Sequence, residues 1–301
     1  LPFIYLYWAT QVFVASYALL QIVFRRTLKG MKTSHTGTVT NESASGLATE
    51  VLEYQVKPTN VGNSSLSVSS HRDVSLSIVV PTYNESENMP DLIERIKTSL
   101  DSLSFELIVV DDSSPDRTGE VVEKLNNDYG NIIVLRRLRK LGLSSAVMDG
   151  FEKAKADVLA VMDADLQHPP ELLPKMYSKI KEGDDLVIAS RFIDGGKIER
   201  WGLHRRIISI TARILTHVLL PETRRIKDVT SGFFMLKRDG IDGLNLGPVG
   251  YKILLEILIK GKNRSVSEVP YVFKPRKKGK SNLGVLEIRD YLLQLYKTLR
   301  G

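Results

Sequence analysis

The segment LSIVVPTYNE, residues 76–85, sets the fold class of this 301-residue chain. Its apolar residues 76–80 have the length and composition of a buried strand, and polar residues end the run. Similar apolar runs follow at residues 105–110, 132–135, 157–162 and 186–189. They alternate with segments of helical period at residues 88–100, 117–127, 144–155 and 170–181. This alternation predicts an α/β fold in which helices cover both faces of a mostly parallel, Rossmann-like sheet.

The N-terminal part of the chain contains a long uncharged segment. No charged residue precedes Arg25 and Arg26, and a helix over residues 1–24 would be about 36 Å long, enough to cross a bilayer core of about 30 Å. We therefore predict a membrane-spanning helix over residues 1–26, with a signal sequence or a core helix as the alternatives. The basic residues after it favour a cytoplasmic location for the rest of the chain. Residues 27–74, rich in Ser, Thr, Asn and Gly, are predicted to form a flexible linker.

The overall composition, with 43% hydrophobic and 26% charged residues, is that of a globular protein. Cysteine is absent, which excludes disulfide bonds, thiolate metal sites and a cysteine nucleophile. The net charge of +7 is concentrated in residues 260–301, which contain 11 Lys and Arg against 3 Asp and Glu. This charge favours phosphate-bearing ligands or an anionic membrane surface, and no helix-turn-helix or zinc-finger pattern indicates nucleic acid. Residues 283–301 are amphipathic, which predicts a membrane-proximal helix or, alternatively, a core-packing one. The same two interpretations apply to residues 201–220.

Acidic residues follow three of the predicted strands. Glu85 follows the first strand, the pair Asp111 and Asp112 the second, and the pair Asp163 and Asp165 the fourth. Because ligands of parallel sheets bind beyond the carboxyl ends of the strands, we expect these carboxylates to face one crevice. A divalent cation, or the hydroxyl and amino groups of a ligand, would relieve their mutual repulsion. The glycine patterns of dinucleotide-binding domains and P-loops, and the GxSxG elbow, are missing from the sequence.

Seven short motifs carry a resemblance to a known family. They are VVPTYNE (79–85), VVDDSSPDRT (109–118), RLRKLGLSSA (137–146), MDADLQHPP (162–170), ASRF (189–192), DVTSGF (228–233) and FKPRKKGKSNLG (273–284). In this order they resemble glycosyltransferase family 2, which has a GT-A fold, and most closely its polyprenol (dolichol)-phosphate mannosyltransferases. The resemblance implies a GT-A catalytic domain over residues 75–282. The chain departs from the family pattern at Ser144, where Gly is usual, and at Asn282, where Lys is common.

The resemblance also implies roles for individual residues. It assigns the nucleotide sugar to Pro81, Tyr83, Glu85, Asp112 and Asp163, and Mg²⁺ or Mn²⁺ to Asp163, Asp165 and Gln167. It assigns the phosphate of the acceptor to Arg191, Ser231, Arg276, Lys280 and Ser281, with Asp228 and Gly232 beside them. Asp163, Asp165, Arg191 and Arg276 would form the catalytic set. Two alternatives remain open at this point: Arg191 as a surface partner of Asp185 or Asp194, and residues 276–280 as a solvated basic loop.

The expected reaction is transfer of mannose from GDP-mannose to a dolichyl or polyprenyl phosphate at the cytoplasmic membrane face. A divalent cation and basic side chains would stabilise the departing diphosphate. A phosphate acceptor is already an anionic nucleophile, so positioning replaces proton abstraction. In-line attack would invert the anomeric centre, as the resemblance also implies. The alternatives are another hexosyltransferase, such as one that uses UDP-glucose, and a non-catalytic module that binds nucleotide sugar or membrane.

Overall fold

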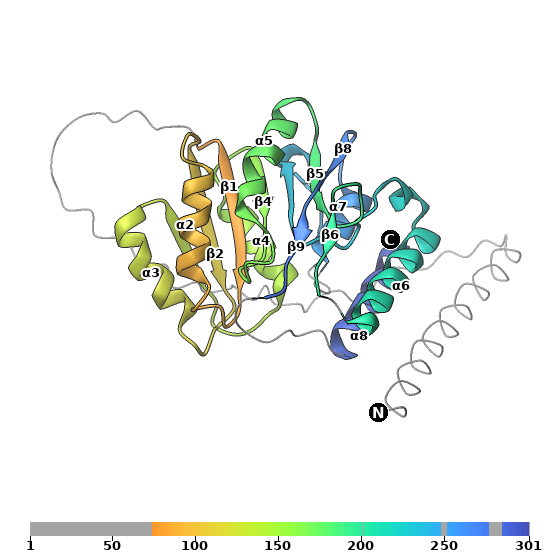
Figure 1. Ribbon diagram of the computed structural model, residues 1–301, viewed down its shortest axis with the longest axis horizontal. Coiled ribbons are helices and arrows are strands. Elements are labelled where there is room, and N and C mark those ends of the chain that lie inside the picture. The colour runs from red at the N-terminus through yellow and green to blue at the C-terminus, as the bar shows by residue number, and fades with distance from the viewer. Residues whose placement is uncertain (1–73, 201, 248–251, 277–284, 301) are drawn as a thin grey trace, which may run out of the picture. The chain divides into compact units, whose positions relative to one another are not determined.

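A seven-stranded sheet forms the centre of the described chain (Figure 1). The computed structural model describes residues 74–200, 202–247, 252–276 and 285–300. The strands are β1 (Leu76–Thr82), β2 (Phe105–Asp111), β3 (Ile132–Arg136), β4 (Val158–Val161), β5 (Leu186–Ser190), β7 (Phe234–Lys237) and β8 (Val266–Pro270). Their order in the sheet is β3-β2-β1-β4-β7-β5-β8. Strand β7 runs antiparallel to β4 and β5, and the other neighbours pair in parallel, which confirms a mostly parallel sheet.

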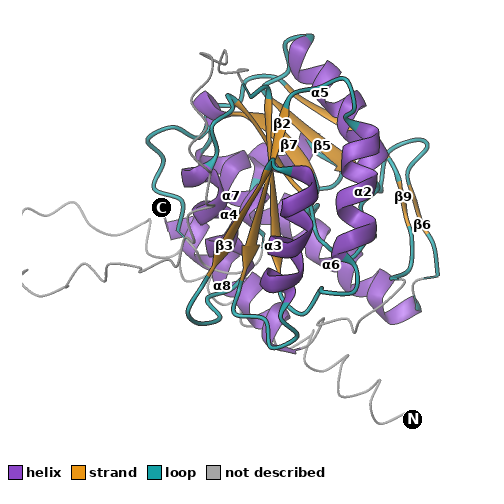
Figure 2. Cartoon of the chain, turned by 90° about the vertical axis from the view of Figure 1, so that its left-hand side faces the viewer, coloured by secondary structure: helices purple, strands orange, loops and turns teal. Residues whose placement is uncertain are grey.

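Helices cover both faces of this sheet, as predicted (Figure 2). One face packs against α2 (Met89–Ser99), α3 (Thr118–Tyr129) and α5 (Leu173–Lys181), and the other against α4 (Leu143–Lys153) and α7 (Ile253–Lys260). Alternate side chains of β1 enter the two cores: Ile78 and Val80 face the first, and Val79 faces the second. On the second face Gly150 brings α4 very close to β1, since a Cβ at this position would lie 2.3 Å from Cγ1 of Val79.

The ends of the predicted elements agree with the structure to within two residues in most cases. The main difference is that two strands, β7 and β8, were not predicted. Strands β7 and β8 complete the sheet after a long crossover that contains α6 (Leu203–Leu219) and a 3₁₀ turn, η2 (Pro221–Arg225). Neither strand was among the predicted runs. Further 3₁₀ turns are η1 (Pro170–Leu172), just before α5, and η3 (Arg238–Gly240), just after β7. A short parallel pair, β6 (Lys197–Ile198) with β9 (Val272–Phe273), forms a second sheet.

The C-terminal helix α8 (Val285–Arg300) packs against the protein along part of its surface. Tyr291 and Leu295 are buried in a small core with Leu220 and Leu255, and the hydroxyl of Tyr291 contacts the hydroxyl of Thr216 in α6. This face of α8 packs into the protein, and the predicted membrane-proximal role of residues 283–301 stays a prediction. The predicted membrane-spanning helix over residues 1–26 and the linker over 27–74 lie outside the described residues. Among the helices that are described, none combines the length and hydrophobicity needed to cross a bilayer.

Candidate active site

The loops after β1, β2 and β4 each contain a residue in the left-handed conformation. These residues are Asn84 (φ 59°), Ser113 (φ 61°) and Leu166 (φ 62°), and none is a glycine. Such backbone conformations cost on the order of 1–3 kcal/mol each and are concentrated at functional sites. Leucine is the least suited of the three, and Leu166 lies between Asp165 and Gln167. The three adjacent strand ends are therefore shaped by tight turns that fix where their polar side chains lie.

Arg276 joins the ends of β1 and β4. Its Nε and Nη2 atoms lie 3.0 and 2.9 Å from Oδ2 of Asp165, and its Nη1 atom lies 3.5 Å from Oε1 of Glu85. Glu85 also accepts a hydrogen bond of 2.6 Å from the Asn88 side chain. The structure thus brings Glu85 and Asp165 together, as the convergence of strand ends predicted. Burial raises the pKa of Glu85, and Asn88 and Arg276 oppose this shift.

Asp163 is positioned from two sides. Its backbone N–H donates a hydrogen bond of 3.0 Å to Nδ1 of His168, and its carboxylate lies against Gly232, where a Cβ would be 3.1 Å from Oδ2. His168 stacks on Phe233 with 5.3 Å between ring centroids, and burial lowers its pKa to about 4. The imidazole is therefore neutral near pH 7 and acts as a hydrogen-bond acceptor.

The two aspartates of the DxD motif suit a divalent cation. Desolvation raises the pKa of Asp163 and that of Asp165, and the charge of Asp163 raises the pKa of Asp165 further. A cation between them would offset this repulsion, and carboxylate oxygens are the ligands that Mg²⁺ and Mn²⁺ prefer. Within the described residues no three acidic, His or Cys side chains form a complete metal cage. Two carboxylates suffice where substrate phosphates and water complete the shell, so the residues fit a metal bound together with a diphosphate.

Gln167 and Asp165 belong to one tight turn. The backbone N–H of Gln167 donates to Oδ1 of Asp165 at 3.0 Å, and its side-chain Nε2 donates to the carbonyl of Lys274 at 2.7 Å. The second bond ties the turn after β4 to the segment after β9. The predicted metal role of Gln167 stays a prediction; its backbone N–H, not its side-chain amide, is the group that bonds the Asp165 carboxylate.

The residues predicted to hold the nucleoside lie at the carboxyl ends of β1 and β2. Pro81 is buried within β1, and the ring of Tyr83 lies 3.5 Å from Nζ of Lys140. Asp112 accepts hydrogen bonds from Arg137 (3.0 Å) and from the backbone N–H groups of Leu141 and Gly142 (both 2.8 Å). Asp112 therefore fixes the loop that leads into α4. Its predicted contact with the base or ribose remains a prediction.

Arg191 is paired with Asp228, so the alternative partners Asp185 and Asp194 are wrong. Its Nε and Nη2 atoms each lie 2.7 Å from an oxygen of Asp228, and its backbone N–H donates to Oδ2 at 3.0 Å. Only 9% of the Arg191 side chain and none of the Asp228 side chain is exposed. Burial alone would raise the pKa of Asp228, but Arg191 reverses the effect and lowers it.

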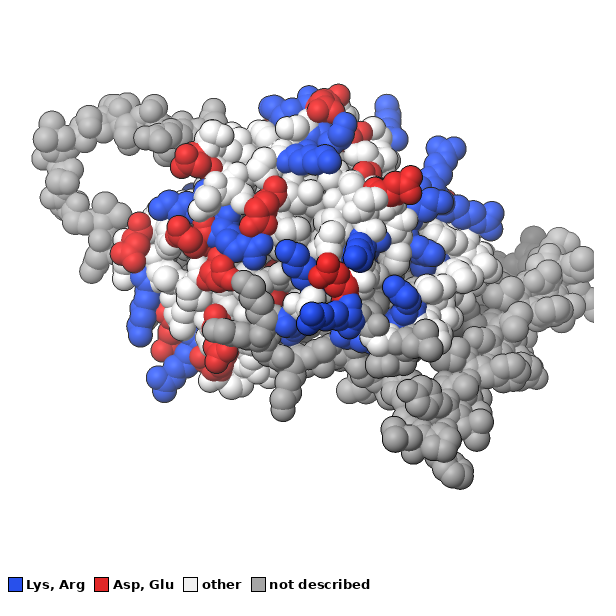
Figure 3. All heavy atoms as spheres, in the orientation of Figure 1, with Lys and Arg blue, Asp and Glu red and all other residues white. Residues whose placement is uncertain are grey.

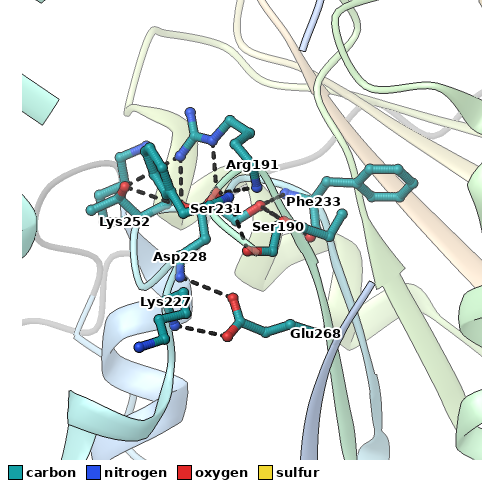
Figure 4. A network of polar contacts seen from close by, with 11 residues as sticks. Ser190, Arg191, Lys227, Asp228, Ser231, Phe233, Lys252 and Glu268 are labelled. Carbon is teal, nitrogen blue, oxygen red and sulfur yellow. Dashed lines mark hydrogen bonds and ion pairs between the residues drawn. The ribbon is translucent and has the colours of Figure 1, made fainter. Parts of the chain in front are cut away.

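A wider hydrogen-bond network fixes this pair (Figure 4). Glu268 of β8 accepts bonds from the backbone N–H groups of Lys227 (2.7 Å) and Asp228 (3.0 Å). Ser231 is buried, and its hydroxyl donates to the carbonyls of Ala189 (2.7 Å) and Phe233 (3.2 Å). In the structure Ser231 thus stabilises the turn that precedes β7, and its predicted contact with a phosphate stays a prediction.

A cavity of about 350 Å³ opens beside Arg191. Its lining combines basic and apolar side chains: Arg191, Lys197, Arg206 and Arg213 with Phe192, Ile198 and Ile210, together with Gly196 and Ser209. Most of these residues come from β6, α6 and the loop after β5. A cavity with several cations and an apolar wall suits an amphipathic anion. Lys280 and Ser281, also predicted at the acceptor phosphate, lie outside the described residues.

Two polar residues of this region were not predicted. Nζ of Lys252, the residue before α7, donates a hydrogen bond of 2.8 Å to the carbonyl of Thr230. Burial and the nearby Arg191 lower the pKa of Lys252 to about 8, while Asp163 and Asp228 act in the opposite direction. The hydroxyl of Tyr271 is buried without a hydrogen-bond partner among the described residues. The sequence offered one indication for Lys252: it is a charged residue immediately before the largely apolar run ILLEIL, residues 253–258.

Comparison with known proteins identifies relatives over most of the chain. Residues 77–244, more than half of the chain, match the family "Glycosyl transferase family 2". A dolichol-phosphate mannosyltransferase of Pyrococcus furiosus is 48% identical over 225 residues, which cover 75% of this chain and 64% of that protein. A dolichol-phosphate mannosyltransferase of Saccharomyces cerevisiae is 36% identical and is matched over 74% of this chain and 86% of its own length. The chain thus spans slightly less than two thirds of the Pyrococcus relative.

Solved structures resemble the fold. Glucosyl-3-phosphoglycerate synthase of Mycobacterium tuberculosis, in complex with Mn²⁺, UDP and glucosyl-3-phosphoglycerate, superposes with a TM-score of 0.57. The match has 23% sequence identity and covers 75% of this chain and 78% of that one. At this identity the likeness concerns the fold, a mostly parallel sheet with helices of the GT-A kind.

Proposed function

Because the chain belongs to glycosyl transferase family 2, we propose that it transfers mannose from GDP-mannose to a dolichyl or polyprenyl phosphate. The names of its relatives from Pyrococcus and Saccharomyces support the acceptor and the sugar. The donor nucleotide is inferred from the resemblance of the seven motifs. The product would be a lipid-linked mannose with inverted anomeric configuration, which serves as a sugar donor for glycosylation.

One observation supports this proposal above the others. Arg276 holds Glu85 and Asp165 together at the strand ends, and Arg191, paired with Asp228, lines a basic and apolar cavity. A carboxylate cluster suits a metal–diphosphate group, and a cationic cavity with apolar walls suits a lipid phosphate. A transferase that joins a nucleotide sugar to a lipid phosphate needs both kinds of site.

On the donor side, Pro81, Tyr83, Glu85 and Asp112 would hold the nucleoside. Asp163, Asp165 and Gln167 would hold Mg²⁺ or Mn²⁺ together with the diphosphate. The bound cation would stabilise the negative charge that develops on the leaving diphosphate. Arg276 is already in contact with Asp165, so its guanidinium is in place to donate hydrogen bonds to the same diphosphate.

On the acceptor side, Arg191 and the basic residues of the cavity would bind the phosphate, with Ser231, Lys280 and Ser281 as further predicted contacts. A lipid phosphate carries its own negative charge near pH 7, so the chain need not remove a proton from the nucleophile. The protein contributes by holding the phosphate oxygen in line with the bond to the leaving diphosphate. In-line attack of this kind inverts the anomeric carbon.

The acceptor implies that the enzyme works at a membrane surface. Helix α6 carries exposed apolar side chains, Ile207, Ile210, Ile214 and Val218, with exposed fractions between 38% and 64%. Arg206 and Arg213 of the same helix line the cavity. Figure 3 shows the protein in the orientation of Figure 1, and basic side chains predominate on its right-hand part, where α6 lies. An apolar stripe beside cations suits the interface of an anionic membrane, which we propose to be the cytoplasmic leaflet.

A donor-by-acceptor assay tests the proposal. Radiolabelled GDP-mannose or UDP-glucose is incubated with the full chain, a polyprenyl phosphate and Mg²⁺ or Mn²⁺, and label is measured in the organic phase. We expect transfer from GDP-mannose that requires both the lipid phosphate and a divalent cation. Transfer from UDP-glucose and not from GDP-mannose would show that the proposed donor is wrong and that the enzyme uses UDP-glucose. Absence of transfer from either donor would contradict the proposed function.

A further inference from the structure

Lys252 occupies a position between the two halves of the site. It immediately precedes α7, and its Nζ atom donates a hydrogen bond of 2.8 Å to the carbonyl of Thr230, in the turn that connects Asp228 to β7. The residues whose charges act on it are Arg191, Asp163 and Asp228. Figure 4 shows Lys252 and Arg191 both adjacent to Asp228. The ammonium group therefore lies near the cation of the acceptor cavity and near the first aspartate of the DxD motif.

The electrostatics of this position favour an anionic ligand. Two cations, Lys252 and Arg191, act on each other in a region from which protein excludes much of the water, and burial and Arg191 both lower the pKa of Lys252. Asp228 is already engaged with Arg191 through two hydrogen bonds. A phosphate next to both cations would offset their repulsion and gain charge-assisted hydrogen bonds.

We propose that the Lys252 ammonium contacts the phosphate of the acceptor, and that Lys252 is therefore a further catalytic residue. This assignment rests on the proposed transfer to a polyprenyl phosphate. Near Asp163 the ammonium would hold the attacking phosphate oxygen close to the metal-bound donor. Its charge would also lower the repulsion between the incoming phosphate and the carboxylates of the DxD motif.

The acceptor is favoured over the donor diphosphate because of where the cations lie. Arg276 makes its ion pairs with Glu85 and Asp165, at the ends of β1 and β4. Among the basic residues that lower the pKa of Asp163, Lys252 acts most strongly and Arg276 and Arg191 follow, whereas His168 and Arg276 lower the pKa of Asp165. Lys252 and Arg191 both bond Thr230, and of these two cations Arg191 lines the cavity, so Lys252 is grouped with the acceptor side and Arg276 with the diphosphate side.

The C-terminal helix holds Lys252 in place. The side-chain Nε2 of Gln294 in α8 donates a hydrogen bond of 2.9 Å to the backbone carbonyl of Lys252. Gln294 is 1% exposed, so this bond is made within the protein interior. A change in the packing of α8 would move the residue from which the ammonium extends. Gln294 is therefore a positioning residue that acts through Lys252.

The first experiment substitutes Lys252 in the full chain. Lys252→Met keeps the length of the side chain and removes its charge, and Lys252→Gln keeps a hydrogen-bond donor for Thr230. Lys262→Met is the matched control, because exposed Lys262 also bonds a backbone carbonyl, that of Asp242, at 3.2 Å. We expect Lys252→Met and Lys252→Gln to raise the KM for a short-chain polyprenyl phosphate by about tenfold to a hundredfold, the range for a lost charged hydrogen bond. The control should keep the wild-type KM.

Two binding measurements separate the assignment from a general loss of structure. Thermal shifts of the protein with GDP and Mn²⁺ should be the same for wild type, Lys252→Met and Lys252→Gln. The thermal shift caused by the short-chain polyprenyl phosphate without metal should be lost in both variants, and Lys252→Arg should restore part of it. A loss of the GDP shift with an unchanged acceptor KM would assign Lys252 to the leaving diphosphate and overturn the proposal. If Lys252→Met does not fold, Lys252→Gln decides by the same criteria.

The result also distinguishes this assignment from the function on which it rests. If the wild-type protein transfers mannose to no polyprenyl phosphate, both fail. If it transfers mannose and the Lys252 variants keep the wild-type acceptor KM, only the assignment of Lys252 fails.

A double-mutant cycle tests the role of Gln294. Gln294→Leu removes the donor and keeps the volume, and Lys297→Ala, at an exposed position of α8, is the control. We expect Gln294→Leu to raise the acceptor KM several-fold in the wild type and to have no further effect in Lys252→Met. Additive effects of the two substitutions would contradict a role of Gln294 through Lys252.

Discussion

Two of the arginine–aspartate ion pairs at the site, Arg276–Asp165 and Arg191–Asp228, differ in how far they are removed from solvent. Arg276 and Asp165 connect two loops, and 26% of the Arg276 side chain is exposed. Arg191 and Asp228 form a bidentate pair in which 9% and 0% of the side chains are exposed, and Glu268 fixes the backbone around Asp228. The first pair can exchange its partner for a ligand. The second pair is part of the scaffold, and it presents a cation to the cavity only because Asp228 remains in place.

The energetics of the two pairs should differ accordingly. Solvent reaches the Arg276 side of the first pair (26% exposed) but little of Asp165 (6% exposed), so breaking it should cost more than the about 0–1 kcal/mol of a surface pair and less than breaking a fully buried one. Removal of one partner from a buried pair costs about 3–5 kcal/mol, because the other charge is left without compensation. We therefore expect substitutions of Arg276 or Asp165 to affect mainly the rate of transfer. Substitutions of Arg191 or Asp228 should lower the stability of the protein as well.

The largest effect on activity is expected from Asp165→Ala. This change removes one of the two carboxylates proposed to hold the metal and diphosphate, and leaves Arg276 partly exposed and near Glu85. We expect transfer to fall by at least about a thousandfold, equivalent to about 4 kcal/mol of transition-state stabilisation, with little change in Tm. The measurement is the initial rate of mannose transfer. Asp194→Ala, at an exposed position outside the site, is the control, and full activity of Asp165→Ala would remove Asp165 from the metal site.

The largest effect on stability is expected from Arg191→Met. The substitution leaves Asp228 buried without its cation, so the free energy of unfolding should fall by about 3–5 kcal/mol. Arg276→Met should lower it by less than Arg191→Met does, because solvent reaches the Arg276 side of its pair. Urea unfolding followed by circular dichroism measures both, and equal losses in the two variants would contradict the distinction between the pairs.

The pH dependence of Arg191→Met follows from the same pair. The folded-state pKa of Asp228 is below its ordinary value of 3.8, so the pair contributes its full stability above that value. The contribution is lost as the pH falls through the folded-state pKa. In Arg191→Met burial raises the pKa of Asp228, so the difference in unfolding free energy between wild type and variant should begin to narrow as the pH falls through that raised pKa, and should go on narrowing until the pH reaches the lowered folded-state pKa of the wild type.

The sequence predicted the donor-side half of the site better than the acceptor-side half. Glu85, Asp163 and Asp165 follow apolar runs directly, and the rule that parallel strands end at one edge was enough to bring them together. For Asp228 the family resemblance predicted only a place beside the residues that bind the acceptor phosphate. Its partner was not evident because Arg191 and Asp228 are separated by α6, and β7 enters the sheet antiparallel between β4 and β5.

Contacts that depend on long-range packing could not be predicted from local patterns. The bond from Gln294 to the carbonyl of Lys252 joins residues 42 apart, and the ion pair between Arg276 and Asp165 joins residues 111 apart. Arg276 is the instructive case. The family motif assigned it to the acceptor phosphate, whereas its ion pairs in the structure are with two carboxylates of the donor side.

A smaller effect, on donor binding, is expected from Arg276→Ala. If its guanidinium binds the diphosphate, the variant should lose about tenfold to a hundredfold in affinity for GDP with Mn²⁺, the range for charged hydrogen bonds. The KM for the polyprenyl phosphate should change less. Isothermal titration with GDP and acceptor saturation curves give the two values. A larger change in acceptor KM than in GDP affinity would restore the assignment made from the motif.

The smallest effect is expected from Gly232→Ala, which tests where the two regions touch. Gly232 lies in the turn that follows Asp228, yet a Cβ at this position would lie 3.1 Å from Oδ2 of Asp163 and 3.2 Å from Cε1 of His168. These distances are a few tenths of an ångström too short, so the Asp163 carboxylate must move. Since a displacement of about 1 Å can cost a hundredfold in rate, a shift of this size should lower kcat by about tenfold.

The matched control for Gly232→Ala is Gly247→Ala, because a Cβ on Gly247 would have no neighbour within 4 Å among the residues that the structure describes. Initial rates at saturating donor and acceptor, together with the Mn²⁺ concentration that gives half-maximal rate, measure the effect. We expect both quantities to change in Gly232→Ala and neither to change in Gly247→Ala, at similar Tm. An unchanged metal requirement in Gly232→Ala would show that the acceptor-side turn does not set the position of Asp163, and the two regions would then act independently.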